Sequence, residues 1–332
     1  MRLDVNRREL IMFVSAATVW PLQAARAQQS ENLARIGFLP LGSPSNQHDL
    51  SYVEAFRKGL IENGLIEGRN IILDVVWVAN DSEYDQAAIE LVRRGATVLV
   101  PVASSASAAC KRQTSTIPIV FINVGNPVGI GIVESLSHPG GNVTGFADLT
   151  VELSGKLLEF ARELTPAGKP IGYLWYDKWV DGQSRLLATE QAAKASGMVL
   201  QARAISDVAE LNNVVADLKS NGIKAVILQP GGFTWRHRQQ IIEVMKRSTL
   251  AMICAWPPVA AEGALIGYGT DYPDLYRRAS SYVSRVLKGE KPADLPVQNP
   301  TKFRLVINLN AAKVLGLQIP TNLLATADEV IE

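Results

Sequence analysis

The chain has 332 residues, of which 47% are hydrophobic and 20% charged, the composition of a globular protein with a sizeable core. This length exceeds one ordinary domain and is enough for two lobes of about 120–150 residues each. The 33 basic and 32 acidic residues balance, which gives no electrostatic reason to expect nucleic acid or an anionic membrane as a partner. Beyond the N-terminus no stretch offers about 18 uninterrupted apolar residues, so we expect no membrane span there.

The first 27 residues have the three parts of an export signal. Arg7 and Arg8 belong to a basic start, residues 10–20 are largely apolar, and residues 25–27 read Ala-Arg-Ala, with small residues where signal peptidase cleaves. The apolar stretch is too short for a transmembrane helix. We therefore predict a signal peptide over residues 1–27 and export to the periplasm. The paired arginines fit the twin-arginine route, and Sec export remains open.

After this leader, short apolar runs alternate with amphipathic stretches of ten or more residues, a pattern typical of β-α-β units around a parallel sheet. The strands predicted in a first set cover residues 34–39, 71–78, 97–102 and 118–124, and the helices cover 49–63, 84–94 and 105–113. The pattern then restarts. The second set has strands at 170–176, 199–204, 225–229 and 251–255, and helices at 182–196, 208–220 and 236–247.

The last part of the chain adds a helix at 273–288, a strand at 304–309 and a short helix at 311–315, which we expect Asn310 to cap. Two successive sets of similar order and length predict two α/β lobes of like topology. We assign residues 33–146 plus about 272–298 to lobe 1, and residues 147–271 plus about 299–332 to lobe 2. Several crossings between the lobes would form a hinge.

The sequence motifs of common enzymes are missing. There is no dinucleotide-binding glycine pattern, no Walker sequence and no Gly-x-Ser-x-Gly elbow. Two isolated cysteines and three scattered histidines do not have metal-ligand spacing. Cys110 and Cys254 fall in different predicted lobes, so we do not expect a disulfide between them. We predict no catalytic residue, no metal and no cofactor.

Small polar or aromatic residues follow the predicted strands. Because ligands of open parallel α/β sheets bind beyond the carboxyl ends of the strands, these residues are candidates for ligand binding. They are Gly42, Ser43, Ser104, Ser105, Gly125 and Asn126 in the first lobe, and Tyr176, Gly231, Gly232, Phe233, Trp256 and Asp271 in the second.

Two groups among these candidates indicate the chemistry of a ligand. Ser104 and Ser105 open a predicted helix, where free backbone N–H groups and two hydroxyls could hold a carboxylate, although simple N-capping would give the same pattern. Tyr176, Phe233 and Trp256 could enclose an aromatic or apolar part of the ligand, and packing within a lobe is the alternative for each.

Short segments along almost the whole chain carry a family resemblance. They include residues 139–145 (Pro-Gly-Gly-Asn-Val-Thr-Gly), and the most specific lie near the end, such as 293–298 (Ala-Asp-Leu-Pro-Val-Gln) and 311–317 (Ala-Ala-Lys-Val-Leu-Gly-Leu). In this order, and after the leader, they resemble the ABC-transporter substrate-binding family of the type I periplasmic-binding fold, the group that includes tryptophan-binding lipoproteins.

The resemblance implies two Rossmann-like α/β lobes with parallel sheets and a multi-crossing hinge. It implies a monomer that captures a small organic ligand, such as an amino acid, an aromatic acid or another small carboxylate, by hinge closure. The partner would be an ABC permease in the inner membrane. Ser104, Ser105, Gly125 and Asn126 fall where family members place donors to a ligand carboxylate.

The sequence departs from the family at two places. Asn126-Pro127-Val128 stands where related sequences often have Asp-Pro-Val, which removes a charge near the site. Residues 231–233 (Gly-Gly-Phe) replace an Asp-Pro-Phe-like segment.

Other functions stay open at this stage. A bilobed receptor could present its ligand to a sensor kinase or chemoreceptor, and a secreted α/β enzyme could use Asp177 or Asp271. A transcription regulator of the same fold would need a helix-turn-helix where this chain has its predicted export signal.

Overall fold

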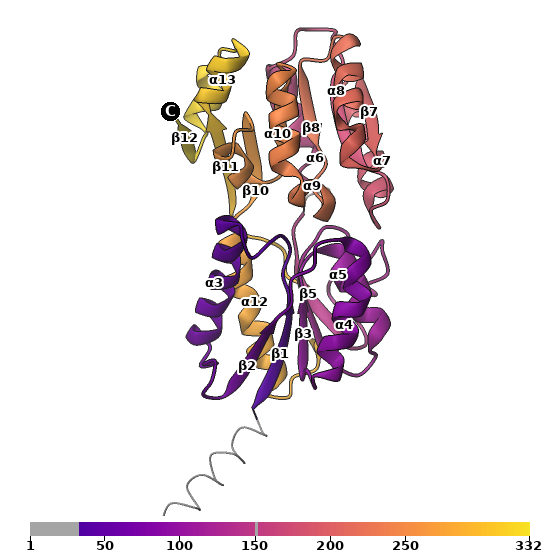
Figure 1. The fold of residues 1–332 in the computed structure, drawn as a ribbon, viewed down its shortest axis with the longest axis vertical. Coiled ribbons are helices and arrows are strands. Elements are labelled where there is room, and N and C mark those ends of the chain that lie inside the picture. The colour runs from indigo at the N-terminus through magenta and orange to yellow at the C-terminus, as the bar shows by residue number, and fades with distance from the viewer. Residues whose placement is uncertain (1–32, 150–151) are drawn as a thin grey trace, which may run out of the picture.

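The structure is a computed structural model and describes residues 33–149 and 152–332. Figure 1 shows two lobes stacked along the long axis of the molecule, each built on its own sheet. The predicted signal peptide, residues 1–27, lies outside the described residues. In the described part of the chain, no helix is both long enough and apolar enough to cross a membrane.

The first lobe contains a five-stranded parallel sheet in the order β2-β1-β3-β4-β5. Its strands are β1 (Ala34–Leu39), β2 (Ile71–Val75), β3 (Val98–Pro101), β4 (Ile119–Val124) and β5 (Val143–Ala147). The helices that accompany them are α3 (Gln47–Glu62), α4 (Tyr84–Arg93), α5 (Ala103–Gln113) and α12 (Tyr272–Leu287), with the short 3-10 helices η1 (Asp81–Glu83) and η3 (Pro292–Asp294). Strand β4 is buried along its whole length, as expected for a parallel strand covered on both faces.

The second lobe contains a seven-stranded sheet in the order β12-β11-β10-β9-β8-β6-β7. Its strands are β6 (Ile171–Tyr176), β7 (Leu200–Ile205), β8 (Ala225–Leu228), β9 (Ala251–Cys254), β10 (Ile266–Thr270), β11 (Phe303–Asn308) and β12 (Glu329–Ile331). Its helices are α6 (Ser154–Glu163), α7 (Gly182–Ala195), α8 (Leu211–Ser220), α9 (Gly232–Arg236), α10 (Arg238–Arg247), α11 (Pro257–Ala261), α13 (Leu309–Leu315) and α14 (Thr321–Ala325), with the 3-10 helix η2 (Val208–Glu210). The β10–β11 pair is antiparallel and the other pairs are parallel.

This architecture confirms the predicted fold class of two α/β lobes. The strands β5, β10 and β12 and the helices α6, α9, α11 and α14 were not predicted from the sequence. It was also wrong about the cap of α13, because Asn308 Oδ1, at the end of β11, accepts the backbone N–H of Ala311 at 2.9 Å. Cys110 and Cys254 are buried and free, as predicted, and burial raises the pKa of each thiol to about 12.

Helix α12 lies late in the chain but belongs to the first lobe, where it packs along α3 (Figure 1). Asp271 caps its start, because Asp271 Oδ1 accepts the Asp274 N–H at 3.1 Å. Its apolar face, which includes Leu275, Tyr276 and Ala279, is buried. The chain therefore leaves the first lobe after β5, returns at α12 and leaves again before β11.

Gly59 allows α3 and α12 to approach closely. A methyl group at this position would lie 2.3 Å from the Arg277 carbonyl oxygen and 2.4 Å from Ser280 Oγ. We expect Gly59→Ala to lower the free energy of unfolding by about 1–3 kcal/mol, since the two helices must separate. The control is Gly155→Ala in α6, where no described atom lies within 4 Å of the new methyl group. It should leave stability unchanged or raise it by up to about 1 kcal/mol. Urea unfolding followed by circular dichroism measures both; equal effects would contradict the expected clash.

Candidate ligand-binding cleft

The two lobes meet at the ends of several strands. A small cavity lies there, between side chains of both lobes. It is lined by Leu41, Tyr52, Asn123, Trp235, Trp256, Tyr272 and Tyr276. One buried apolar cluster runs through it, from Leu41 and Tyr52 of the first lobe to Trp235 and Trp256 of the second. The lobes are therefore in direct contact around this cavity.

On one side of the cavity, Trp235 of α9 reaches across to the first lobe. Its indole N–H donates to Asp49 Oδ1 in α3 at 2.9 Å, and its ring contacts Tyr52 with 6.1 Å between ring centroids. Arg238 lies 3.7 Å from Asp49 and makes a 2.8 Å ion pair with Glu262. Burial raises the pKa of the Asp49 carboxyl, while the Ser43 N–H and Arg238 act in the opposite direction.

On the other side, Arg236 makes a second contact between the lobes. Its guanidinium donates to Asp81 Oδ1 of η1 at 2.5 Å and to the Tyr84 hydroxyl of α4 at 2.9 Å. Ser105 Oγ donates to the other oxygen of Asp81 at 3.0 Å. Burial raises the pKa of Tyr84 to about 12, so its hydroxyl stays neutral at physiological pH. A charged pair therefore joins the lobes near the start of α5.

A third group of polar side chains is buried deeper, around Asp181 and Arg185 at the start of α7. Arg185 Nε donates to Asp181 Oδ2 at 2.9 Å, and its guanidinium lies over the Trp179 ring at 4.5 Å from the ring centroid. Ser104 Oγ of the first lobe is 3.5 Å from Asp181 Oδ2. Asp181 and Arg185 are only 2% and 3% exposed.

Several buried polar atoms in this region have no hydrogen-bond partner among the described residues. They are the Tyr52 and Tyr272 hydroxyls, Asn123 Oδ1, Trp179 Nε1, Asp181 Oδ1, Gln229 Oε1 and Arg236 Nε. Unpaired buried polar atoms are costly, so a set of them in one region makes it a candidate ligand site.

The backbone is strained at the same place. Ala103 lies just after β3, and Asn123 lies near the end of the adjacent strand β4. Both residues have left-handed backbone conformations, with φ of 70° and 64°. Such conformations are unfavourable for residues other than glycine and cluster at binding sites.

The predicted residues of the first lobe have different roles. Gly42 has φ of 106°, and Ser43 N–H donates to Asp49 Oδ2 at 2.8 Å, so this turn orients Asp49. Ser104 is fully buried beside Asp181, and Ser105 contacts Asp81.

Gly125 and Asn126 form a turn after β4, in which Asn126 Oδ1 accepts the Gly129 N–H at 2.9 Å. Neither residue is among those that line the cavity.

The predicted site residues of the second lobe also differ in what they contact. Tyr176 and Phe233 stack on each other with centroids 4.1 Å apart, and Trp256 lines the cavity and contacts Trp235. Gly231 lies against the Trp179 ring, and Gly232 lies near Asp81 of the first lobe. Asp271 caps α12, and this capping role accounts for an aspartate at this position without a ligand contact.

Comparison with known proteins shows to which family the chain belongs. A model of the ABC transporter substrate binding protein family matches residues 45–331. The chain belongs to this family. The tyrosine-binding protein of Clostridioides difficile is 27% identical over 267 residues, which cover 80% of this chain and 76% of that protein. The ABC domain of Streptococcus pneumoniae in complex with L-Trp is 26% identical, with a TM-score of 0.82 over 90% of this chain and all of that one.

The fold is that of type I periplasmic-binding proteins and the related repressors. The lac repressor dimer has a TM-score of 0.58 over 85% of this chain and 96% of its own, at 13% identity. This substrate-binding protein of an ABC transporter binds small molecules and is not an enzyme.

The sequence analysis of this substrate-binding protein missed Asn123, Asp181, Arg185 and Trp235. Two of them left a signal. Asn123 is the one polar residue in the run Ile119–Val124, and Asp181 and Arg185 are four residues apart, the spacing at which opposite charges meet on a helix. Nothing in the sequence shows that Trp235 reaches the other lobe.

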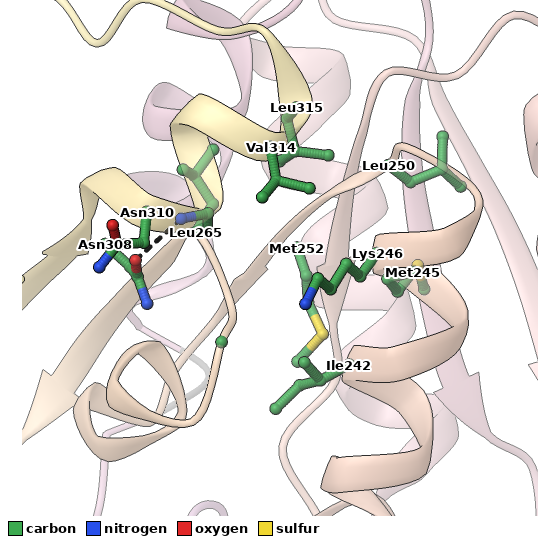
Figure 2. Close-up of a pocket in the computed structure, with 12 residues that line it drawn as sticks. Ile242, Met245, Lys246, Leu250, Met252, Leu265, Asn308, Asn310, Val314 and Leu315 are labelled. Atoms are coloured by element: carbon green, nitrogen blue, oxygen red, sulfur yellow. Dashed lines mark hydrogen bonds between the residues drawn. The ribbon is translucent and has the colours of Figure 1, made fainter.

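A second pocket of the substrate-binding protein lies between α10 and α13 (Figure 2). Its wall includes Ile242, Met252 and Val314, with Lys246 and Asn310 among the polar residues. All lining residues belong to the second lobe, so a movement of the lobes does not complete this pocket. Within the described ranges, no three His, Cys, Asp or Glu side chains are grouped so that they could hold a metal ion.

Proposed function

We propose that this substrate-binding protein captures a small organic ligand between its lobes by hinge closure and delivers it to an ABC permease in the inner membrane. The ligand is an amino acid, an aromatic acid or another small carboxylate. The observation that supports this most is the cleft itself, where polar atoms of both lobes are buried without partners, at Asn123, Asp181 and Gln229. Each lobe supplies part of the site, so a ligand favours the closed form.

The two bodies that move are residues 33–146 with 272–298 and residues 147–271 with 299–332. Three connections join them, after β5, before α12 and before β11. Short multiple connections favour a hinge over free tumbling of the lobes.

The start of α5 is the proposed carboxylate site. Its N-cap residue, Val102, provides no side-chain hydrogen bond, so the first backbone N–H groups of the helix are free to bind an anion. Ser104 adds a buried hydroxyl, whereas the hydroxyl of Ser105 is engaged by Asp81. The aromatic side chains of Trp235, Trp256 and Tyr272 favour an aromatic ligand part. The names of the two relatives, one for tyrosine and one in complex with L-Trp, support the same class.

Thermal unfolding with a ligand panel tests this proposal. The panel contains L-tyrosine, L-tryptophan, their analogues without the amino group, phenylacetate and succinate. A true ligand at 100 times its Kd should stabilise the protein by about 2.7 kcal/mol and raise Tm by several degrees. Small-angle X-ray scattering with the same ligand should show the closed shape. A panel in which no compound raises Tm would contradict the proposed ligand class.

The periplasmic location has its own test. The mature protein should appear in the osmotic-shock fraction, and mass spectrometry should find it to begin at Gln28. Recovery of the full-length chain from the cytoplasm would contradict the predicted export.

A further inference from the structure

The pocket between α10 and α13 shares no lining residue with the cavity between the lobes (Figure 2). Its floor is deeply buried, with Met252 of β9 at 2% exposure and Leu265, just before β10, at 1%. Ile242 and Met245 of α10 form one wall. Val314 of α13 also lines the pocket and is 56% exposed, so the pocket opens to solvent at this helix.

The pocket has room for a small apolar group. Its volume is ≈ 140 Å³. Gly263 brings the loop after α11 against α10, because a methyl group in its place would lie 3.0 Å from Ile242 Cγ2. The two methionines of the lining have flexible side chains that adapt to the shape of a ligand. An apolar cavity of about 150 Å³ holds a benzene molecule, so a single ring or a chain of about six carbons fits here.

One charged group reaches this apolar surface. Figure 2 shows the Lys246 side chain extending from α10 into the space between α10 and α13. Its ammonium makes no ion pair or hydrogen bond with residues 33–149 or 152–332, and none of the described lining residues is acidic.

The side chain of Asn308, another polar residue of the lining, is already engaged. Its Nδ2 donates to the Ala260 carbonyl at 2.8 Å, and its Oδ1 accepts the Ala311 N–H at 2.9 Å. The charge available to a ligand in this pocket is therefore the cation of Lys246. A free cation beside an apolar pocket favours a ligand with an anionic head and an apolar tail.

We propose that this pocket is a second binding site, which takes a small monocarboxylate with an apolar tail. The tail lies between Met245 and Met252, and the carboxylate pairs with the Lys246 ammonium. Because all lining residues belong to the second lobe, this ligand binds the open and the closed form alike and does not drive closure. The site is independent of ligand capture between the lobes, so its failure would leave the proposed function intact.

NMR of methionine methyl groups locates the ligand directly, with hexanoate as the probe. After the predicted signal peptide the chain has three methionines, Met198, Met245 and Met252, and the last two line the pocket. Met198 lies between α7 and β7, and β7 and β12 are opposite edges of the sheet. Hexanoate should shift the Met245 and Met252 signals with a Kd on the order of 1 mM and leave the Met198 signal unchanged.

Hexan-1-ol, which has the same tail without the charge, tests the role of Lys246. The wild-type protein should bind hexanoate about fivefold more tightly than hexan-1-ol, and Lys246→Gln should lose this preference. The matched control is Lys219→Gln, because Lys219 is also an exposed lysine in the last turn of a helix, α8. This variant should keep the preference.

Other outcomes would count against the second site. If about 20 mM hexanoate shifted neither pocket methionine, or shifted Met198 equally, the pocket would not be a specific site. Equal wild-type affinity for hexanoate and hexan-1-ol would mean that Lys246 only covers apolar surface with its chain, and would overturn the carboxylate ligand. A preference for hexanoate that survives in Lys246→Gln would overturn the assigned ion pair.

Discussion

Replacing Trp235 with alanine is expected to have the largest effect of any single change in the cleft. The side chain is 3% exposed, contacts Trp256 at 5.0 Å between centroids and lies under the Arg238 guanidinium at 4.1 Å. Removing a buried tryptophan costs about 3–5 kcal/mol, and here Asp49 also loses its indole donor. Part of this loss in stability comes from weakening the contact between the lobes.

We therefore expect Trp235→Ala to weaken ligand binding on the order of 100-fold and to increase the radius of gyration of the ligand-free protein. Calorimetry and X-ray scattering measure these quantities. Trp235→Phe is the matched variant, because it keeps an aromatic ring while it loses the hydrogen bond to Asp49 and part of the indole packing. Its effect should be clearly smaller. An unchanged shape and affinity in Trp235→Ala would show that Trp235 does not hold the lobes together.

The ion pair between Arg236 and Asp81 should contribute the second-largest effect. These side chains are 11% and 25% exposed, so the pair is partly shielded from water. Residues in such contact couple by about 0.5–3 kcal/mol. In a double-mutant cycle of Arg236→Ala and Asp81→Ala, ligand affinity should fall in each single variant, and the losses should not add.

The matched control for this cycle is the exposed pair Arg203–Asp217, which has the same residue types but lies entirely in the second lobe. Its coupling in ligand affinity should be near zero. Additive losses for Arg236 and Asp81 would mean that the pair does not act in closure.

The sequence allowed the fold class to be predicted because alternating apolar and amphipathic stretches are local signals. Strand β5 was not predicted because Gly145 interrupts Val143–Ala147 and weakens its strand pattern; the strand forms by pairing with β4. Strand β12 has only three residues and depends on β11 for its pairing.

Only part of the candidate site could be predicted from the sequence. The rule that ligands bind at strand ends depends on topology alone, and it proposed Ser104, which lies beside Asp181, and Trp256, which lines the cavity. It did not locate Asp181 or Trp235, whose importance comes from contacts with residues of the other lobe, Ser104 and Asp49. Asn126 fell at a strand end but is engaged in its own turn.

The late position of α12 has a consequence for how the protein is made. The rings of Phe38, Tyr52 and Phe146 in the first lobe pack against Tyr276 and Tyr282 of this helix. While the ribosome is still adding the strands of the second sheet, that apolar surface has no cover. The N-terminal third of the nascent chain therefore cannot complete its fold alone and depends on a segment synthesised more than 120 residues after β5. We expect the unfinished lobe to be prone to aggregation until α12 has been made.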